Sequence, residues 1–94
     1  MSEGADGCRA DVWLWRARFF KTRAMAARFV EVGRIRLFRL GAASRVDKAS
    51  RLLRPGDQLT FAIGGRLVTI RVTGPGERRG PASEARTLYE AVTS

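Results

Sequence analysis

The segment 59–72 constrains the fold more than any other part of this 94-residue sequence. Two runs of alternating apolar and polar residues flank Gly64-Gly65, and glycines accept the positive φ angles of the primed turns that close tight hairpins. A two-residue loop places Phe61 opposite Val68, so one face of the hairpin is apolar. The predicted strands are Leu59–Ile63 and Arg66–Val72, with Leu59 opposite Ile70 on the apolar face, and Thr60 opposite Thr69 and Gln58 opposite Arg71 on the polar face.

Two helices are expected before this hairpin. Residues 9–21 mix apolar and basic side chains without a glycine or proline, which favours a first helix. Thr22 offers its hydroxyl as the N-cap of a second helix over 23–32, and Gly33 stands where a left-handed residue ends such a helix. In the second helix the i,i+4 pairs Met25–Phe29 and Ala26–Val30 predict one shared apolar face.

The other elements have weaker signals. Residues 34–40 alternate basic and apolar side chains, as a short strand does, and 41–44 is a run of small residues expected to form a loop. The segment 46–53 is open between turn and strand. Residues 54–57 are typical of a turn, and 81–92 fits a terminal helix that begins near a proline. The sequence therefore predicts an α+β fold, in which two N-terminal helices pack on a small antiparallel sheet, with a short C-terminal helix.

The length allows one domain. We expect a disordered tail over 1–8, the main domain over 9–75, and a C-terminal extension with the short helix over 76–94. Cys8 is the single cysteine, so no disulfide can form within the chain, and a reducing cytoplasm is the expected location. No stretch approaches the roughly 20 apolar residues of a membrane span, so no membrane contact is expected.

Positive charge is concentrated in one half of the chain. The sequence has 18 Lys and Arg against 9 Asp and Glu, and thirteen of the basic residues lie in 9–54 beside three carboxylates. Residues 55–94 hold five basic and four acidic groups. An uneven excess of this kind is typical of a domain that binds a nucleic acid on one face. An arginine-rich composition alone would not spare the second half.

The sequence lacks the common catalytic and metal-binding groups. It has no histidine, which is the usual general base and the commonest neutral metal ligand, and a single cysteine gives no zinc spacing. Neither Gly64-Gly65 nor Gly74-Pro75-Gly76 opens a helix in the way that a phosphate-cradling loop does. We therefore expect a binding protein with no catalytic activity, cofactor or metal.

The start of the second predicted helix is the strongest candidate site. Lys21, Thr22 and Arg23 surround a helix N-terminus, whose free amides attract phosphate, and capping by Thr22 is compatible with that role. Further cations follow along the chain, and arginine suits bidentate contacts to phosphates and bases. The candidates in this group are Lys21, Thr22, Arg23, Arg28, Arg34, Arg36, Lys48, Ser50 and Arg51.

Two pairs of side chains have two interpretations each. Trp13 and Trp15 could stack on bases, although tryptophans in an apolar helix are more often core residues. Arg78-Arg79 are either RNA contacts or a solvated charge pair. Both questions are open at the level of the sequence.

Several short motifs occur together in a familiar order: Arg9-Ala10-Asp11, Leu14, Lys21-Thr22-Arg23, Ala26-Ala27, Gly33-Arg34-Ile35-Arg36, Lys48-Ala49-Ser50 and Pro55-Gly56-Asp57. They resemble the S-four RNA-binding domain, also called the alpha-L motif. Two further groups of residues are similar to the branch of bacterial ribosome-associated heat-shock proteins. These groups are Trp13-Leu14-Trp15 with Arg18-Phe19-Phe20-Lys21-Thr22-Arg23, and Arg78-Arg79-Gly80-Pro81-Ala82-Ser83-Glu84-Ala85 with Leu88-Tyr89-Glu90.

This resemblance implies a helix pair that, with the loop after it, binds structured RNA. The branch implies association with free large ribosomal subunits that still carry peptidyl-tRNA after stalled translation. The family's RNA face falls on Arg9, Lys21, Thr22, Arg23, Arg28, Arg34, Arg36, Lys48 and Ser50. The sequence departs from the family pattern at Ala10, where a core leucine is usual, at Phe38, where an asparagine is usual, and in a longer loop at 41–44.

We therefore expect a monomeric, non-catalytic protein of the cytoplasm that binds ribosomal RNA on the large subunit. Transfer RNA is a second candidate partner, and DNA is a weaker one. The alternative is a general nucleic-acid-binding protein without ribosomal specificity. Few aromatic side chains are expected outside the core, which favours folded RNA over single strands as the target.

Overall fold

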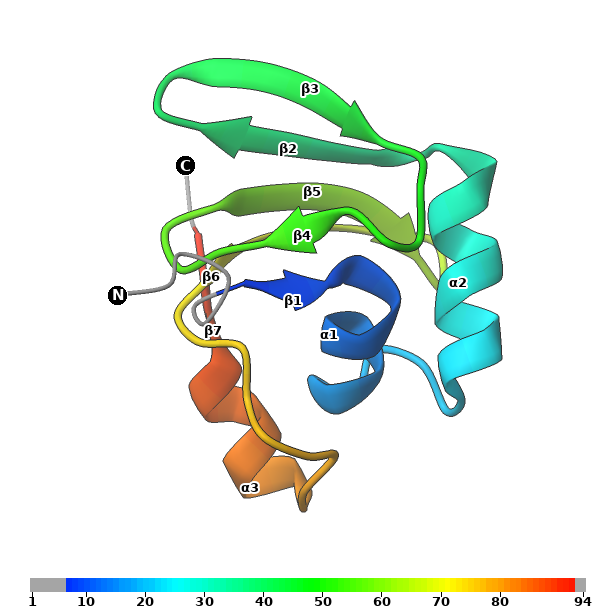
Figure 1. Ribbon diagram of the computed structural model, residues 1–94, viewed down its shortest axis with the longest axis vertical. Coiled ribbons are helices and arrows are strands. Elements are labelled where there is room, and N and C mark those ends of the chain that lie inside the picture. Colours follow the sequence, from blue (N-terminus) through cyan, green and yellow to red (C-terminus); the bar gives the residue numbers. More distant parts are fainter. Residues whose placement is uncertain (1–6, 93–94) are drawn as a thin grey trace.

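The computed structural model describes residues 7–92 and has the predicted α+β architecture (Figure 1). Two helices and a five-stranded antiparallel sheet form its main layers, and a two-stranded sheet lies beside the first helix. The elements are β1 (Cys8–Arg9), α1 (Ala10–Arg16), α2 (Arg23–Val32), β2 (Ile35–Arg39), β3 (Ala42–Val46), β4 (Leu52–Leu53), β5 (Gln58–Ile63), β6 (Arg66–Val72), α3 (Ala82–Ala85), the 3-10 turn η2 (Arg86–Leu88) and β7 (Tyr89–Ala91).

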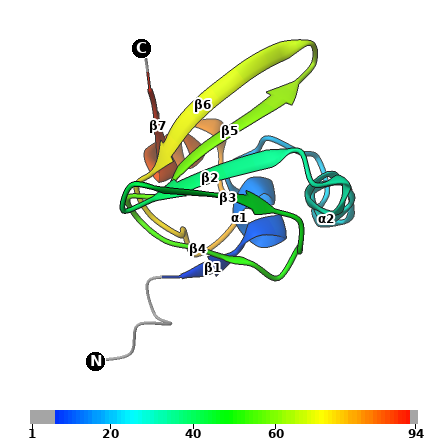
Figure 2. The same ribbon diagram turned by 90° about the horizontal axis from the view of Figure 1, so that it is seen from above.

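The five-stranded sheet has the order β3-β2-β5-β6-β7, with every neighbouring pair antiparallel. The hairpin β5–β6 is confirmed in its Gly64-Gly65 loop and its register, with Phe61 opposite Val68, and β5 begins one residue earlier than predicted, at Gln58. Its loop end projects away from the rest of the molecule (Figure 2). The alternation predicted this hairpin because a register shift by one residue would have turned its apolar face to water.

The core lies between the helix pair and the apolar face of the sheet. Trp13 and Leu14 of α1 and Val30 of α2 are fully buried, and they cluster with the inward residues of β2, β5 and β6. The indole Nε1 of Trp13 donates a 2.8 Å hydrogen bond to the carbonyl of Gly74, so the ring is held at both its apolar and its polar end. Trp13 is therefore a core residue, and Trp15 is half-buried.

Helix α2 has the predicted bounds because both of its ends are capped. The Oγ1 of Thr22 accepts from the backbone N–H of Met25 at 3.1 Å, and Gly33 has a φ of 81°. The predicted apolar face is only partly correct. Ala26 and Val30 are buried, but Met25 is 50% exposed, because α1 and the sheet cover one side of the helix only.

The first helix was predicted over 9–21 and ends at Arg16, which corrects the sequence interpretation. Arg18 adopts a left-handed φ of 66°. The N–H of Phe19 donates to the carbonyl of Leu14 at 3.0 Å, and that of Arg18 to Trp15 at 3.1 Å, the pair of bonds that closes a Schellman motif. The turn carries Phe19 into the core, where its ring lies 5.4 Å from that of Phe61. Because the left-handed residue is an arginine rather than a glycine, the sequence does not indicate that the helix ends here.

The predicted loop at 41–44 is also wrong, because Ala42, Ala43 and Ser44 belong to strand β3 and only Gly41 lies in a turn. Arg39 pairs with Ala42, so the loop contains only Leu40-Gly41, both with positive φ as a type I′ turn requires. The sequence signal was weak because a leucine rarely takes the first position of such a turn. The β2–β3 hairpin therefore replaces the expected single strand and long loop.

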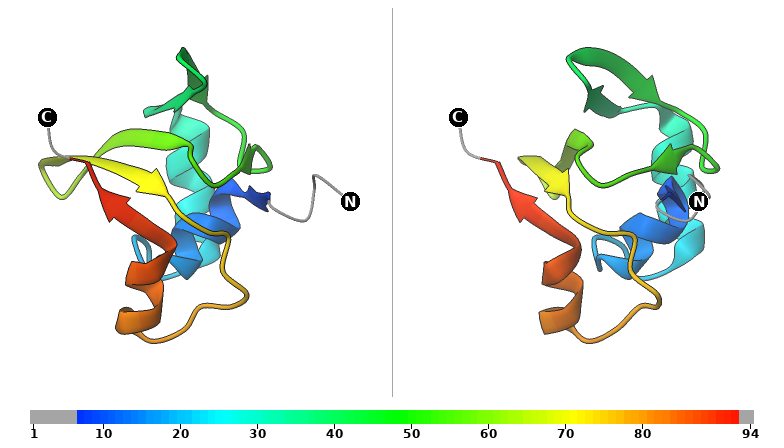
Figure 3. Two further views of the ribbon diagram at one scale, coloured as in Figure 1. Left: turned by 90° about the vertical axis from the view of Figure 1, so that its left-hand side faces the viewer. Right: turned by 60° about the vertical axis from the view of Figure 1, so that its left-hand side comes forward.

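The predicted terminal helix over 81–92 is much shorter, since only Ala82–Ala85 is α-helical. The chain then forms η2 and returns to the sheet edge as β7 (Figure 3). There the ring of Tyr89 lies 4.9 Å from that of Phe19, and β7 pairs with the edge of β6 that β5 leaves free.

Residues 1–6 of the predicted tail lie outside the described residues, whereas Cys8 is buried and belongs to β1. The proposed domain boundary at 75/76 stays a prediction.

We predict that Trp13→Phe destabilises the protein by about 1–3 kcal/mol, because the buried carbonyl of Gly74 would lose its donor. Trp15→Phe is the matched control, since no hydrogen bond of its indole occurs within residues 7–92, and it should change the free energy of unfolding much less. Urea unfolding of the two variants and the wild type measures both effects. Equal destabilisation by the two substitutions would contradict this account of the core.

Candidate nucleic-acid interface

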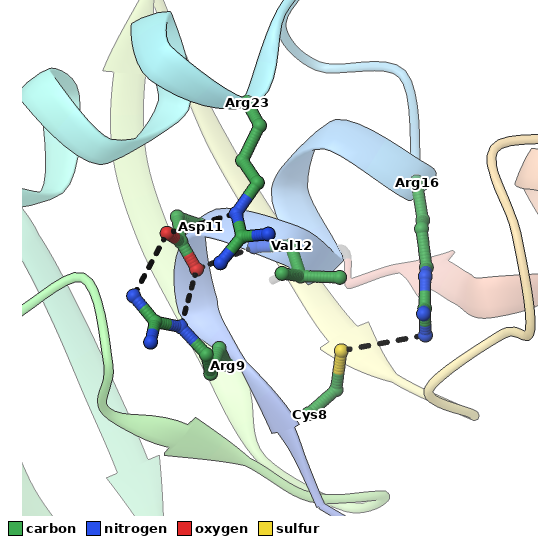
Figure 4. A network of polar contacts seen from close by, with 6 residues as sticks. All are labelled: Cys8, Arg9, Asp11, Val12, Arg16 and Arg23. Atoms are coloured by element: carbon green, nitrogen blue, oxygen red, sulfur yellow. Dashed lines mark hydrogen bonds and ion pairs between the residues drawn. The ribbon is translucent and has the colours of Figure 1, made fainter.

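The carboxylate of Asp11 joins two predicted site residues from different elements. Its oxygens accept from Arg9 at 3.1 and 3.2 Å and from the Nε of Arg23 at 3.3 Å. The backbone N–H of Val12 donates to it at 2.8 Å. The Asp11 side chain is 4% exposed, whereas Arg9 and Arg23 are about half exposed. Figure 4 shows both guanidinium groups against this one carboxylate, so a buried anion holds two cations at the surface.

Opposing effects set the pKa of Asp11. Burial alone raises the pKa of the carboxyl group. Hydrogen bonds from Arg9, from the Val12 amide and from Arg23 lower the pKa by more than burial raises it. The net pKa lies below its usual value, so Asp11 is ionised at neutral pH. The network is therefore charge-assisted, and hydrogen bonds between charged groups are stronger than those between neutral groups.

The segment 48–51 lies directly beside this network. The pairing of β1 with β4 is extended by two backbone hydrogen bonds, from Ala10 to the Arg51 carbonyl at 2.8 Å and from Asp11 to the Ala49 carbonyl at 3.2 Å. The two predicted loop residues Lys48 and Ser50 are exposed, and Arg51 is half-buried. Together with Asp47 these three line a shallow hollow of about 290 Å³.

A second hollow lies where α2 ends and the β2–β3 hairpin begins. It has a volume of about 260 Å³ and contains the predicted residues Arg34 and Arg36, together with Arg45. Ser44 lines it as well, and the Oγ of Ser44 lies 3.4 Å from an Nη of Arg51. This contact links the hollow to the segment 48–51 and through it to Asp11.

The structure thus connects nine of the ten predicted site residues into one surface, which we call the basic band. Lys21 and Thr22 belong to it as the neighbours of Arg23 at the start of α2. The tenth residue, Arg28, lies apart, in an apolar hollow with Phe20, Met25, Phe29 and Val32. The basic band consists of Arg9, Lys21, Thr22, Arg23, Arg34, Arg36, Lys48, Ser50 and Arg51, with Arg45 as an addition.

Arg45 was missed because 41–44 was interpreted as a loop, which gave no register for the residues after it. The sequence offered little signal here, because the first four residues of β3 are all exposed and only Val46 is buried. The sequence analysis also did not predict that Phe38 on β2 is exposed to solvent, and its exposed fraction is 42%.

Several other arginines have partners inside the fold. Arg16 donates to the carbonyls of Pro75 and Gly76, and Arg18 to that of Gly80, which fastens the C-terminal segment to α1. For Arg78-Arg79 the structure shows contacts within the chain, and whether either residue also contacts RNA stays a prediction. Arg78 pairs with Glu84, and Arg79 donates to the carbonyls of Trp15 and Phe20.

Metal-binding and membrane-spanning features are also absent from the described chain. Within residues 7–92 no group of three His, Cys, Asp or Glu residues is placed to hold a metal ion. No helix in the same range is long and apolar enough to cross a membrane.

Comparisons with known proteins place this chain and its fold in a family. Heat shock protein 15 of Escherichia coli is 39% identical over 82 residues, which are 87% of this chain and 58% of that relative. The RQC P-site tRNA stabilizing factor of Halalkalibacterium halodurans is 35% identical over 87% of this chain and 86% of the relative. The trimeric structure of heat shock protein 15 from Vibrio cholerae superposes with a TM-score of 0.79, at 35% identity, over 92% of this chain and 82% of the other.

The chain belongs to the heat shock protein 15 family. No protein-family model matches it, and the chain spans 58% of the length of the Escherichia coli relative. The predicted branch of heat-shock proteins is thereby confirmed. The S-four motif is not named by these relatives and stays a resemblance. The trimeric state belongs to the Vibrio cholerae member, and the monomer expected for this family member stays a prediction.

In this heat shock protein 15 family member, Asp11→Asn should destabilise the fold by about 1–3 kcal/mol at pH 7, because two arginines lose a charged acceptor. The pKa of Asp11 is lowered by folding, so its stabilising effect is present above the usual value of 3.8. It is lost as the pH falls through the lowered pKa of the folded state. The difference between wild type and variant should therefore shrink below about pH 4.

Urea unfolding at pH 7 and at pH 3 measures this difference in the free energy of unfolding. Asp47→Asn is the control, because Asp47 is exposed and has no ion pair among the described residues. A difference for Asp11→Asn that stays constant over this pH range would contradict the ion-pair account.

Proposed function

We propose that this chain binds structured ribosomal RNA on the large ribosomal subunit that carries peptidyl-tRNA after stalled translation. It acts by occupying this site, as a rescue or recycling factor linked to heat shock, and catalyses no reaction. The proposed contacts are the residues of the basic band, with Arg28 as an outlying contact. The proposed location is accordingly the cytoplasm.

The match to the RQC P-site tRNA stabilizing factor carries this proposal. It covers 86% of that relative, so the region shared with this chain is nearly the whole of a protein that is named for stabilising a tRNA. Heat shock protein 15, the other named relative, supplies the link to heat shock. Neither name is that of an enzyme.

The geometry supports the same proposal. The basic band comes from β1, the start of α2, the β2–β3 hairpin and the segment before β4, and hydrogen bonds hold three of its arginines. Arg9 and Arg23 are held by Asp11, and Arg51 by Ser44. Cations held in fixed positions match the phosphates of a folded RNA better than those of a flexible strand. Ser50 and Thr22 add neutral donors beside the charges.

We predict that Lys21→Gln with Lys48→Gln weakens co-sedimentation with purified large subunits, because both lysines are exposed members of the basic band. If each contacts one phosphate, the slope of log K against log salt should become shallower by roughly 0.7–0.9 per lysine. The measurement is the fraction bound at several salt concentrations.

The matched control is Arg66→Gln with Arg86→Gln, which removes the same charge from exposed positions outside the basic band. This control should bind nearly as the wild type does. Equal weakening by the two double variants would mean that net charge alone drives binding, which is the behaviour of a general nucleic-acid-binding protein.

A further inference from the structure

Three arginines line one hollow at the end of α2, and none of them forms an ion pair within residues 7–92, although Asp47 also lies near this helix end. Arg36 on β2 is directly opposite Arg45 on β3, and both side chains are exposed. Arg34 continues the outward alternation of β2, because Ile35 between Arg34 and Arg36 points into the core. Within residues 7–92 no hydrogen bond or ion pair involves the side chain of any of these three arginines.

This arrangement is unfavourable in the isolated chain. Like charges directly opposite one another on neighbouring strands repel, and cross-strand pairs are normally of opposite charge. A Cβ on Gly33 would lie 3.3 Å from the Cδ of Arg45, so the stem of Arg45 lies against the end of α2. The three side chains surround a hollow of about 260 Å³, which suits an anion that would relieve their repulsion.

An exposed aromatic ring adjoins this hollow. Phe38 follows Arg36 by two positions on the same outward face of β2, a separation of about 7 Å along a strand. Its cross-strand neighbours are Ala43, which lines the hollow, and Gln58. Phe38 is 42% exposed and makes no aromatic pair within the described chain. Small and polar neighbours thus leave part of the ring uncovered.

We propose that this outer face of the β2–β3 hairpin binds one unpaired nucleotide of a folded RNA, with its phosphate in the arginine hollow and its base stacked on Phe38. An anion site beside an uncovered ring fits a nucleotide, since bases of bulges and loops stack on aromatic side chains while arginines hold the backbone. This inference rests on the proposed function and assigns a specific ligand to one end of the basic band, to which it adds Phe38.

The test uses the full chain with two probes, a fluorescently labelled oligouridylate and a blunt RNA duplex of the same length. Phe38→Leu keeps an apolar side chain but removes the ring, and it should lower the affinity for oligouridylate by about 5- to 100-fold. The affinity for the duplex should change less than about twofold, because paired bases cannot stack on the ring. Arg45→Gln should weaken both probes and make their salt dependence shallower.

Leu67→Ala and Arg66→Gln are the matched controls, since both positions are exposed at the far end of the β5–β6 hairpin. Melting temperatures of Phe38→Leu, Leu67→Ala and Arg66→Gln should equal that of the wild type, because none removes a fully buried side chain. Arg45→Gln should melt at the same or a higher temperature, because it relieves the repulsion from Arg36. Wild-type affinity of Phe38→Leu for oligouridylate would overturn the nucleotide site. Binding of the wild type to large subunits is measured in parallel. If the wild type does not bind them, the proposed function is contradicted. The comparison of oligouridylate affinities still decides whether the nucleotide site exists.

Discussion

The buried carboxylate of Asp11 is the interaction on which the rest of this surface depends. An ionised group that is 4% exposed needs strong partners, and here they are the guanidinium groups of Arg9 and Arg23 and one backbone amide. These partners come from β1, α1 and α2, so the hydrogen bonds to one carboxylate hold three elements together. The same need fixes two cations at the surface, so packing and the proposed binding face share one cause.

The arginines of this chain divide into two structural groups. Arg16, Arg18 and Arg79 donate to backbone carbonyls and fasten the C-terminal segment to α1, as part of the fold itself. Arg34, Arg36 and Arg45, around β2 and β3, have no such partners in the described chain and stay exposed. Arg39 at the end of β2 belongs with the first group, because it donates to the carboxylate of Asp57 and to the carbonyl of Leu52. The charge excess counted from the sequence is therefore not all available to a ligand.

The sequence predicted the elements whose signals are local. The β5–β6 hairpin follows from strict alternation around two glycines, and α2 follows from Thr22 and Gly33 at its ends. The elements that depend on distant contacts were missed. α1 ends early because Phe19 turns into the core, and β7 forms because Tyr89 packs beside it at the open edge of β6.

The candidate site shows the same division. Lys21 and Thr22 could be chosen from their place before a helix, but the role of Asp11 needs the spatial approach of Arg23 to Arg9. Arg45 became visible only with the β2–β3 register, in which it faces Arg36. A left-handed Leu40 made that hairpin hard to predict, so the residues beyond it could not be assigned to a face.

Competition binding tests the central claim most directly, namely that this surface recognises folded ribosomal RNA. Purified large subunits, an unstructured RNA and a DNA duplex compete for the labelled chain at about physiological salt, so that all three present phosphates under the same screening. The account predicts clear preference for the large subunits. Equal affinity for all three competitors would contradict it and would leave only nonspecific attraction to polyanions.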